Sequence, residues 1–463
     1  MAVPSFSGSL AKYPARASFA WYAGLVTLGA LLLRLPMCRG SAAATRINIL
    51  DAIFTSTSAA CVTGLAVRDT GSDFSFIGQL VILGMIQLGG IGIMTVTTFT
   101  LLNLGTRTSL RHRNVIAETL GADERTDLRW VLRNVIITTF VCEAIGWLLL
   151  SLRFAFAQGK DFGHAIWSGL FHSVSAFCNA GFSLYSNSLT YYSDDPIVCG
   201  VVIALVVIGG LGFPVILDIF RHWKQPWGEL WVKLSMHSKV MLIGTAALLA
   251  FSTVGIFLLE IDGVLAELPW WQKPIVAAFH AVSCRTAGFN TIDVATLSNA
   301  TLFVSILLML VGAGPCSTAG GFKVSTLMVL ALHAWTRFRG GTHINFARRS
   351  IPSEAAGRAT AVAMLFTVVM VVALTALLVI EQHSIPHRES KGLFMDALFE
   401  TASALGTVGL STGMTEQLSH AGRLIIIILM FLGRLGPISV FAAISSIEQR
   451  HTLEYEHEEP LLG

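Results

Sequence analysis

Eight long apolar segments recur along this chain and limit what it can fold into. They lie near residues 18–34, 76–104, 130–157, 197–220, 238–260, 300–334, 359–381 and 421–447. Each can supply the ~20 apolar residues that a helix needs to cross a bilayer. The chain of 463 residues is 54% hydrophobic and 13% charged, whereas soluble domains hold about 25% charged residues. The sequence therefore predicts an all-α polytopic membrane protein in a lipid bilayer.

Four shorter apolar stretches lie between the members of consecutive pairs of long segments. They cover about residues 48–60, 163–177, 270–284 and 393–405. These lengths are too short to cross a bilayer and suit a re-entrant half-helix. The predicted unit is therefore helix, re-entrant loop, helix. It occurs four times, over residues 1–105, 106–222, 223–340 and 341–463.

Basic residues predict the orientation of these helices. No clean small-x-small cleavage site ends the first apolar segment, which follows Lys12 and Arg16, so we expect a retained helix and not a signal peptide. With the N-terminus in the cytoplasm, the loops richest in Lys and Arg fall on that side. We expect the protein to be a multi-pass protein of the plasma membrane, namely a bacterial inner membrane, with both termini in the cytoplasm. The net charge of +3 predicts no nucleic-acid partner.

The four short stretches share one motif. It begins at a Phe, continues through a helix rich in Ser, Thr and Ala, and ends at a Gly followed by an apolar residue. The copies run over Phe54–Gly64, Phe171–Gly181, Phe279–Gly288 and Phe399–Gly409. A glycine-rich motif follows each copy 24–28 residues later. Single glycines commonly pack membrane helices, but two motifs that recur in phase four times indicate a shared function.

Backbone at the end of each half-helix can provide the oxygens that a dehydrated cation needs. Irregular backbone survives at membrane depth only where it lines a cavity, and stacked carbonyls there select ions. Four such loops around a pseudo-fourfold axis would make one cation-conducting pore within one chain. The predicted filter residues are Val62, Thr63, Gly64, Asn179, Ala180, Gly181, Thr286, Ala287, Gly288, Thr407, Val408 and Gly409. Arg285, beside the third set, is expected to point behind its loop and hold it to a carbonyl or an acid.

The glycine-rich helix motif carries a charge in its fourth copy. Gly90, Gly210 and Ala313 occupy the position that Arg434 takes there. Small residues would keep a passage open below the filter, and an arginine would repel a waiting cation. A charge at membrane depth is a functional candidate by default. The alternative is an interhelical ion pair with one of the few carboxylates in the spans, which are Glu143, Asp218 and Glu400.

The sixth long segment is interrupted by glycines and a proline over 312–323. Such a sequence does not stay helical, so we predict two helices joined by a movable gate under the filter. A packing kink is the alternative; a phosphate cradle lacks the required spacing and strand. Lys323 could simply extend toward the cytoplasmic side. The predicted gate residues are Gly312, Gly314, Ser317, Thr318, Gly320, Gly321, Lys323 and Arg434.

These motifs, over essentially the whole chain, resemble the Trk/Ktr/HKT superfamily of potassium transporters. The four filter loops, the break at 312–323 and Gly433-Arg-Leu-Gly-Pro437 carry the resemblance, which is strongest to the KtrB type of membrane subunit. It implies K⁺ translocation, a homodimer with one pore per chain, and a cytoplasmic RCK-domain ring of the KtrA type. Nucleotide would bind only to that ring. Dependence on Na⁺ stays open, and four filter glycines favour K⁺.

Two rival classes make different predictions. A secondary transporter with a broken-helix substrate site would have halves of opposite topology, whereas all four units here share one orientation. An intramembrane enzyme would need paired Asp/Asp, Ser/His or His/Glu side chains at depth, and the sequence suggests none. The seven cysteines are scattered without a CxxC pair. The chain is therefore expected to be a transporter and not an enzyme.

Overall fold

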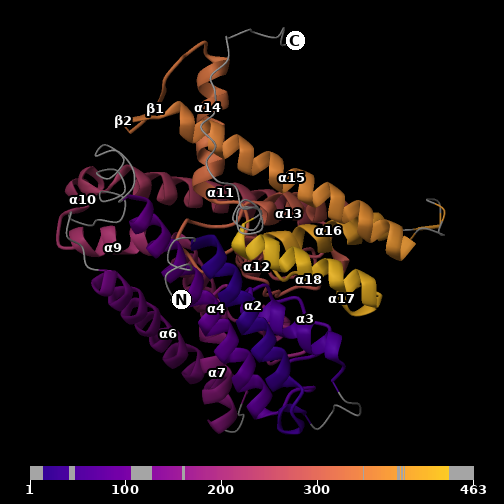
Figure 1. The fold of residues 1–463 in the computed structure, drawn as a ribbon. Helices are drawn as coiled ribbons and strands as arrows, with labels where there is room; N and C mark the ends of the chain where they lie inside the picture. The colour runs from indigo at the N-terminus through magenta and orange to yellow at the C-terminus, as the bar shows by residue number, and fades with distance from the viewer. Residues whose placement is uncertain are drawn as a thin grey trace, which may run out of the picture.

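The computed structural model describes residues 14–40, 47–105, 128–158, 162–347, 349–382, 386, 389–390 and 392–436. Side chains are described for most of these, excluding 14, 15, 17, 93–105, 128–132, 157, 158, 227 and 382. Helices dominate these ranges, and those of the N-terminal half gather on one side of the molecule while those of the C-terminal half gather on the other (Figure 1).

All eight long apolar segments contain helix. The helices are α2 (Pro14–Leu33), α4 (Phe76–Gly105), α6 (Leu128–Gln158), α8 (Pro196–Leu211) with α9 (Phe213–His222), α11 (Met236–Glu260), α13 (Asn299–Leu310) with α14 (Val324–Phe338), α15 (Ser353–Gln382) and α18 (His420–Leu435). By length and composition, three segments within the described ranges can each cross a membrane alone, namely Arg133–Phe156, Met236–Glu260 and Ser353–Glu381; the bent pair α8 and α9 would make a fourth. The prediction for residues 437–447 lies outside the described residues.

The four shorter apolar stretches also form helices. They are α3 (Ile49–Ala60), α7 (Phe162–Phe177), α12 (Gln272–Ser283) and α16 (Leu393–Gly406). From the Phe of the motif to the end of each helix, every residue is buried. In contrast, the long helices α6, α11 and α15 expose large apolar side chains such as Leu148, Phe251 and Val372. Exposed apolar surface of this extent is what lipid contact requires.

The remaining elements are short. They comprise three 3₁₀ turns, η1 (Pro36–Cys38), η2 (Thr190–Tyr192) and η3 (Val294–Thr296), the helices α10 (Trp227–Lys233) and α17 (Met414–Gln417), and the strands β1 (Ile344–Phe346) and β2 (Arg349–Ile351). The two strands form an antiparallel hairpin that pairs Ile344 with Ile351. This hairpin departs locally from the all-α prediction, and its β-branched and aromatic residues favour extended backbone. It lies beside the end of α14 (Figure 1).

The fourth apolar segment is broken, although the sequence predicted one continuous span. Helices α8 and α9 are turned by 98° at Gly212, which has a φ of +92°. Pro214 follows in the first turn of α9, and proline cannot donate to a preceding helix. The Phe213 amide instead donates to the Cys316 carbonyl over 3.1 Å. The break therefore accommodates the loop that joins α13 to α14.

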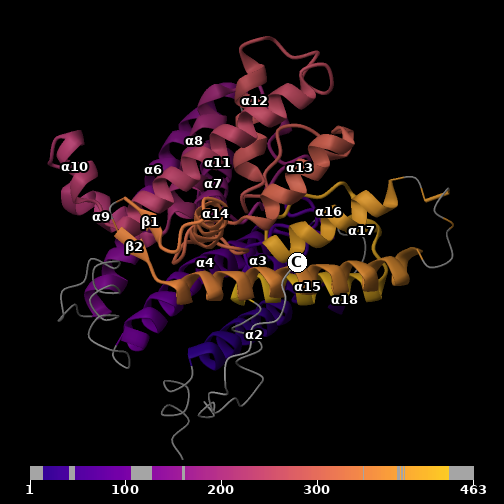
Figure 2. The same ribbon diagram turned by 90° about the horizontal axis from the view of Figure 1, so that it is seen from above.

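The last helix packs against the first half-helix, so the first and last parts of the chain meet. Asp51 on α3 is buried and accepts hydrogen bonds from Arg68 over 3.0 Å and from Arg423 of α18 over 2.7 Å. Leu405, Ile426 and Met430 belong to the same apolar core as Phe54 of α3. Helix α15 runs alongside α18 (Figure 2). This closure arranges the four short helices around a common centre.

Candidate functional site

Each short helix ends in a turn with the same backbone conformation. Two residues per turn have positive φ, the glycine of the motif and the residue two places before it. The non-glycine residues with positive φ are Val62 (55°), Asn179 (57°), Thr286 (69°) and Thr407 (51°), and the glycines are Gly64 (97°), Gly181 (70°), Gly288 (73°) and Gly409 (94°). The intervening residue has negative φ. Because neighbouring residues alternate in handedness, the backbone departs from an ordinary strand or helix.

The amide groups of these turns are directed back toward their own helices. In the first turn the Val62 amide donates to the Ala59 carbonyl over 3.1 Å, and the Thr63 amide donates to the Ser58 carbonyl over 2.8 Å. The second and fourth turns repeat both bonds with the equivalent residues. The third motif is one residue shorter, and there the Ala287 amide donates to the Ser283 carbonyl over 3.0 Å. In the part of the protein that the structure describes, ten of the twelve turn amides thus donate to groups of their own short helix, and those of Gly181 and Thr286 do not.

A serine in each short helix braces the turn, and the sequence analysis did not single it out. It stands four residues after the Phe of the motif, at Ser58, Ser175, Ser283 and Ser403. The Ser58 and Ser403 hydroxyls each accept from the amide of their motif glycine over 3.0 Å. The Ser175 hydroxyl donates to the Phe182 carbonyl over 2.8 Å, and the Ser283 hydroxyl donates to Phe289. Comparing the four copies position by position would have revealed this serine.

The carbonyl groups of the turns remain available. Within the described part of the chain, none of the twelve predicted filter carbonyls accepts a hydrogen bond. Nine of these twelve residues are buried, and buried carbonyls without partners are rare in proteins, so each calls for an explanation. Water or a cation in the space that they face would provide one.

The four turns form a closed ring in chain order. A Cβ placed on any of the four glycines would lie 3.0 Å or less from the carbonyl oxygen of the middle residue in the next turn. At Gly64, Gly288 and Gly409 this is closer than real Cβ atoms come, and at Gly181 it is closer than most do. The pairs are Gly64 with Ala180, Gly181 with Ala287, Gly288 with Val408 and Gly409 with Thr63. The last pair returns to the first turn. The ring therefore requires glycine at four positions both for its positive φ and for the close approach of neighbouring backbones.

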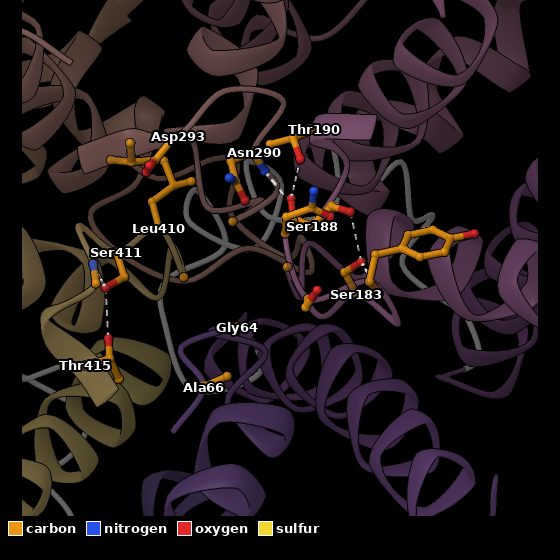
Figure 3. Close-up of a pocket in the computed structure, with 18 of the residues that line it drawn as sticks. Gly64, Ala66, Ser183, Ser188, Thr190, Asn290, Asp293, Leu410, Ser411 and Thr415 are labelled. Carbon is orange, nitrogen blue, oxygen red and sulfur yellow. Dashed lines mark hydrogen bonds between the residues drawn. The ribbon is translucent and has the colours of Figure 1, made fainter. Parts of the chain in front are cut away.

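A vestibule opens on the glycine side of the ring. Its cavity of about 740 Å³ is open to solvent and is lined by all four motif glycines. Hydroxyl and amide groups from the loops after each turn surround it, including Ser183, Asn290 and Ser411 (Figure 3). Asp69, Asp293 and Glu416 also line it. Carboxylates and hydroxyls at such an entrance attract cations and replace part of their hydration.

The loop between α13 and α14 lies on the other side of the ring. A Cβ on Gly320 would clash with Thr407 of the fourth turn, and one on Gly321 would lie 3.1 Å from the Gly406 carbonyl. The loop also reaches the helix glycines, since the Gly314 amide donates to the Gly210 carbonyl over 2.8 Å. Most of its residues are buried. All predicted gate residues of this loop therefore lie at one end of the ring, opposite the vestibule.

Arg434 holds this loop through main-chain carbonyls and not through an acid. Its guanidinium donates to the Thr318 carbonyl, to the Gly89 carbonyl over 2.8 Å and to the Tyr22 hydroxyl over 3.3 Å, and the residue is 3% exposed. The three candidate carboxylates bind elsewhere: Glu143 to Gln87, Asp218 to Ser235 and Ser238, and Glu400 to Ser411 and Thr415. The predicted alternative of an interhelical ion pair is therefore wrong. Arg434 instead joins α18, α4, α2 and the loop.

Two further cations contact the same loop. Lys323 donates to the Ala319 carbonyl over 2.7 Å and to the Gly320 carbonyl over 3.2 Å, so it folds back on the loop and does not extend away from it. Arg285, which is buried, lies 3.5 Å from the Gly312 carbonyl oxygen. That placement agrees with the expectation that Arg285 points behind its own turn toward a carbonyl. Arg285 thus contacts the start of the loop, Arg434 its middle, and Lys323 the part near its end.

The first glycine of the helix motif has a packing role in three copies. A Cβ on Gly89, Gly209 or Gly433 would clash with the carbonyl oxygen near the end of the short helix in the same unit. The second position differs: Gly90 faces Cys178, with Thr318 next nearest, and Gly210 faces Ala313. Packing thus accounts for the first glycine, and the second borders the space that the loop and Arg434 occupy.

Tyr22 is a member of this cluster that the sequence did not reveal, because an isolated tyrosine in an apolar segment has no distinguishing pattern. Its ring is fully buried, and its hydroxyl donates to the Gly89 carbonyl over 2.7 Å while accepting from Arg434. Tyr22→Phe removes that one oxygen. We expect it to raise basal cation flux, by less than Arg434→Ala does, because Arg434 keeps two of its acceptors.

Isotope flux into vesicles measures this effect, with Tyr192→Phe as the control because the Tyr192 hydroxyl contacts Tyr185 away from the loop. In an Arg434→Ala background, Tyr22→Phe should add nothing further. Additive effects of the two substitutions would contradict the role assigned to the hydroxyl.

Comparisons with known proteins identify the family of this chain. The family model TrkH, described as cation transport protein, matches residues 30–455. The chain is 37% identical over 421 residues to the Ktr system potassium uptake protein B of Vibrio alginolyticus, covering 90% of this chain and 88% of the relative. It is 34% identical to the potassium/sodium uptake protein NtpJ of Enterococcus hirae over 438 residues, covering 94% and 93%.

A solved structure supports the fold. The potassium transporter TrkH from Vibrio parahaemolyticus superimposes with a TM-score of 0.71 at 19% identity, over 92% of this chain and 83% of that one. The family match spans nearly the whole chain, and the family is one of membrane cation transporters and not of enzymes. This chain belongs to the TrkH cation transport protein family, and its resemblance to the Trk/Ktr/HKT superfamily is confirmed.

Proposed function

We propose that this chain translocates K⁺ across a membrane through the ring of four turns. The observation that carries the proposal is the set of twelve carbonyls without hydrogen-bond partners in a closed ring beneath a polar vestibule. Carbonyl oxygens at such a ring replace the hydration shell of a cation. The names of the relatives, which specify potassium uptake and potassium/sodium uptake, favour K⁺ and keep Na⁺ as a second ion to test.

The loop at 312–323 is proposed to act as the gate, with Arg434 as its latch and as a positive barrier. Its support is the position of the loop across the end of the ring and the hydrogen bond from Arg434 to Thr318. Hydrogen bonds between main-chain groups join the loop to α8 and α18, so a partner that binds the displaced loop more tightly than the docked one would open the gate.

A regulatory subunit is the proposed source of that energy. The relative from Vibrio alginolyticus carries the name of a Ktr system, which favours a partner for this chain as well. We propose a cytoplasmic RCK-domain ring that binds nucleotide, and a homodimer of this chain with one pore in each protomer. The division into four repeat units, over residues 1–105, 106–222, 223–340 and 341–463, stays a prediction from the sequence. The charge distribution supports cytoplasmic termini, and the bacterial relatives favour a bacterial inner membrane.

Growth in a host that lacks its own K⁺ uptake tests the proposal. With the chain and an RCK partner, we expect growth at low K⁺ and uptake of K⁺ and Rb⁺ in preference to Na⁺. Repeating the uptake measurement with and without external Na⁺ decides whether transport depends on it. Failure to restore growth by a correctly inserted chain, with or without the partner, would refute the proposal.

A further inference from the structure

A buried carboxyl group lies behind the second turn of the ring, and the transport proposal does not use it. Glu143 stands in the middle of the apolar segment Arg133–Phe156 and is 4% exposed. Its Oε2 accepts from the Gln87 amide of α4 over 3.0 Å, and its Oε1 lies 3.8 Å from the Cys178 sulfur. Among the described residues, no Lys, Arg or His forms an ion pair with it. An ionisable group at membrane depth without a counter-charge indicates a function.

The position of Glu143 connects it to the ring. Cys178 directly precedes Asn179, the first residue of the second filter turn, and the Cys178 sulfur also faces Gly90 of α4. The carboxyl is thus separated from the proposed ion path by one residue. A negative charge on Glu143 would lie in a buried, poorly solvated region. It would therefore attract a cation in the ring much more strongly than it would in water.

The other groups around Glu143 are few. Helix α7 contributes the Ser173 hydroxyl, which donates to the Glu143 main-chain carbonyl over 2.7 Å, and Cys178 follows that helix. Helix α8 presents Leu205 near Gly146, one turn away on α6. Arg434 is connected to this region through its hydrogen bond to the Gly89 carbonyl, two residues along α4 from Gln87. Cys178 is therefore the titratable side chain that directly faces the carboxyl within the described structure.

Burying a carboxylate is costly unless a cation neutralises it. A cation in the adjacent ring would neutralise it, but only while the ring is occupied. We propose that Glu143 is a proton-binding site linked to occupancy of the ring: the carboxyl holds a proton when the ring is empty and releases it to bulk water when K⁺ binds. This inference rests on the proposed function. Linkage is reciprocal, so protons must also weaken K⁺ binding.

The first test measures the K⁺ concentration for half-maximal flux at pH 6 and pH 8 in vesicles that contain the full chain with its partner. In the wild type we expect that concentration to be roughly fivefold or more higher at pH 6. Glu143→Gln keeps the size and the bond to Gln87 but cannot titrate, so its value should not change with pH. Glu260→Gln is the control, because Glu260 is equally buried but accepts from the Ser298 and Val264 amides at the end of α11.

A second measurement does not depend on any variant. Adding K⁺ to lightly buffered wild-type protein in detergent should release up to about one proton per chain, detected with a pH dye. Equal pH dependence in wild type and Glu143→Gln, or K⁺ transport without pH dependence or proton release, would overturn the inference. Absence of K⁺ flux in the wild type itself would instead refute the proposed function.

Discussion

Gly409→Ala is expected to abolish selective K⁺ uptake while leaving the protein in the membrane. Gly409 has a φ of +94°, and a Cβ there would clash with the Thr63 carbonyl and lie 2.9 Å from the Gly64 Cα. Both neighbours are backbone atoms of the first turn, so no side chain can rotate away. The methyl group must therefore push the first and fourth turns apart and displace a carbonyl of the proposed filter.

The matched control lies four residues further along. Gly413 has a φ of +95°, and a Cβ there would meet nothing within 4 Å. Alanine pays the same conformational penalty of about 1–2 kcal/mol at both positions, so their difference isolates the clash across the ring. Overpacking of this kind costs about 1–3 kcal/mol, which corresponds to a roughly tenfold to hundredfold loss of the intact ring.

Rubidium uptake, competition by Na⁺ and the amount of protein in the membrane are the measurements. Gly413→Ala should retain uptake and ion preference. Gly409→Ala should lose uptake, or lose preference for K⁺ over Na⁺, at an equal amount of protein. Wild-type selectivity in Gly409→Ala would show that the ring of turns does not select the ion.

The turns were predictable from the sequence because their requirements are local and repeated. Positive φ at Gly64 and its three equivalents selects glycine, and four copies in phase separate this signal from ordinary helix packing. The order in which the turns touch was not predictable, since it depends on contacts between residues more than a hundred positions apart. The bracing serines carried a repeated signal that comparison of the copies would have detected.

Two sequence predictions were wrong, the alternative ion pair of Arg434 and the unbroken helix at Gly212. Both depend on contacts with main-chain carbonyls. The acceptors of Arg434 on α4 and in the loop are carbonyls, which every residue possesses, so the sequence suggested an ion pair with Glu143, Asp218 or Glu400 instead. The bend at Gly212 likewise depends on the Cys316 carbonyl of a distant loop. Gly212 and Pro214 allow a helix to break at this point, but the apolar composition of the segment favoured one continuous helix.

Arg434→Ala is expected to increase cation flux, with the largest increase when the regulatory partner is absent. The substitution removes a positive charge from the end of the ring and removes the hydrogen bond that joins α18 to the gate loop at Thr318. It also releases the Gly89 carbonyl and the Tyr22 hydroxyl, which would still bond to each other. Hydrogen bonds from charged groups contribute about 1.5–3 kcal/mol each, so losing one to the loop predicts a roughly tenfold or larger rise in open pores.

Lysine at the same position separates the two effects. It keeps the charge but cannot reproduce the planar fork that reaches three acceptors from one side chain. If repulsion of the cation dominates, Arg434→Lys should keep flux low; if the latch dominates, flux should rise nearly as far as in Arg434→Ala. Arg153→Ala is the control, because Arg153 pairs with Asp195 over 2.6 Å away from the loop. Unchanged flux in folded Arg434→Ala protein would contradict both roles and leave Arg434 as a structural link between helices.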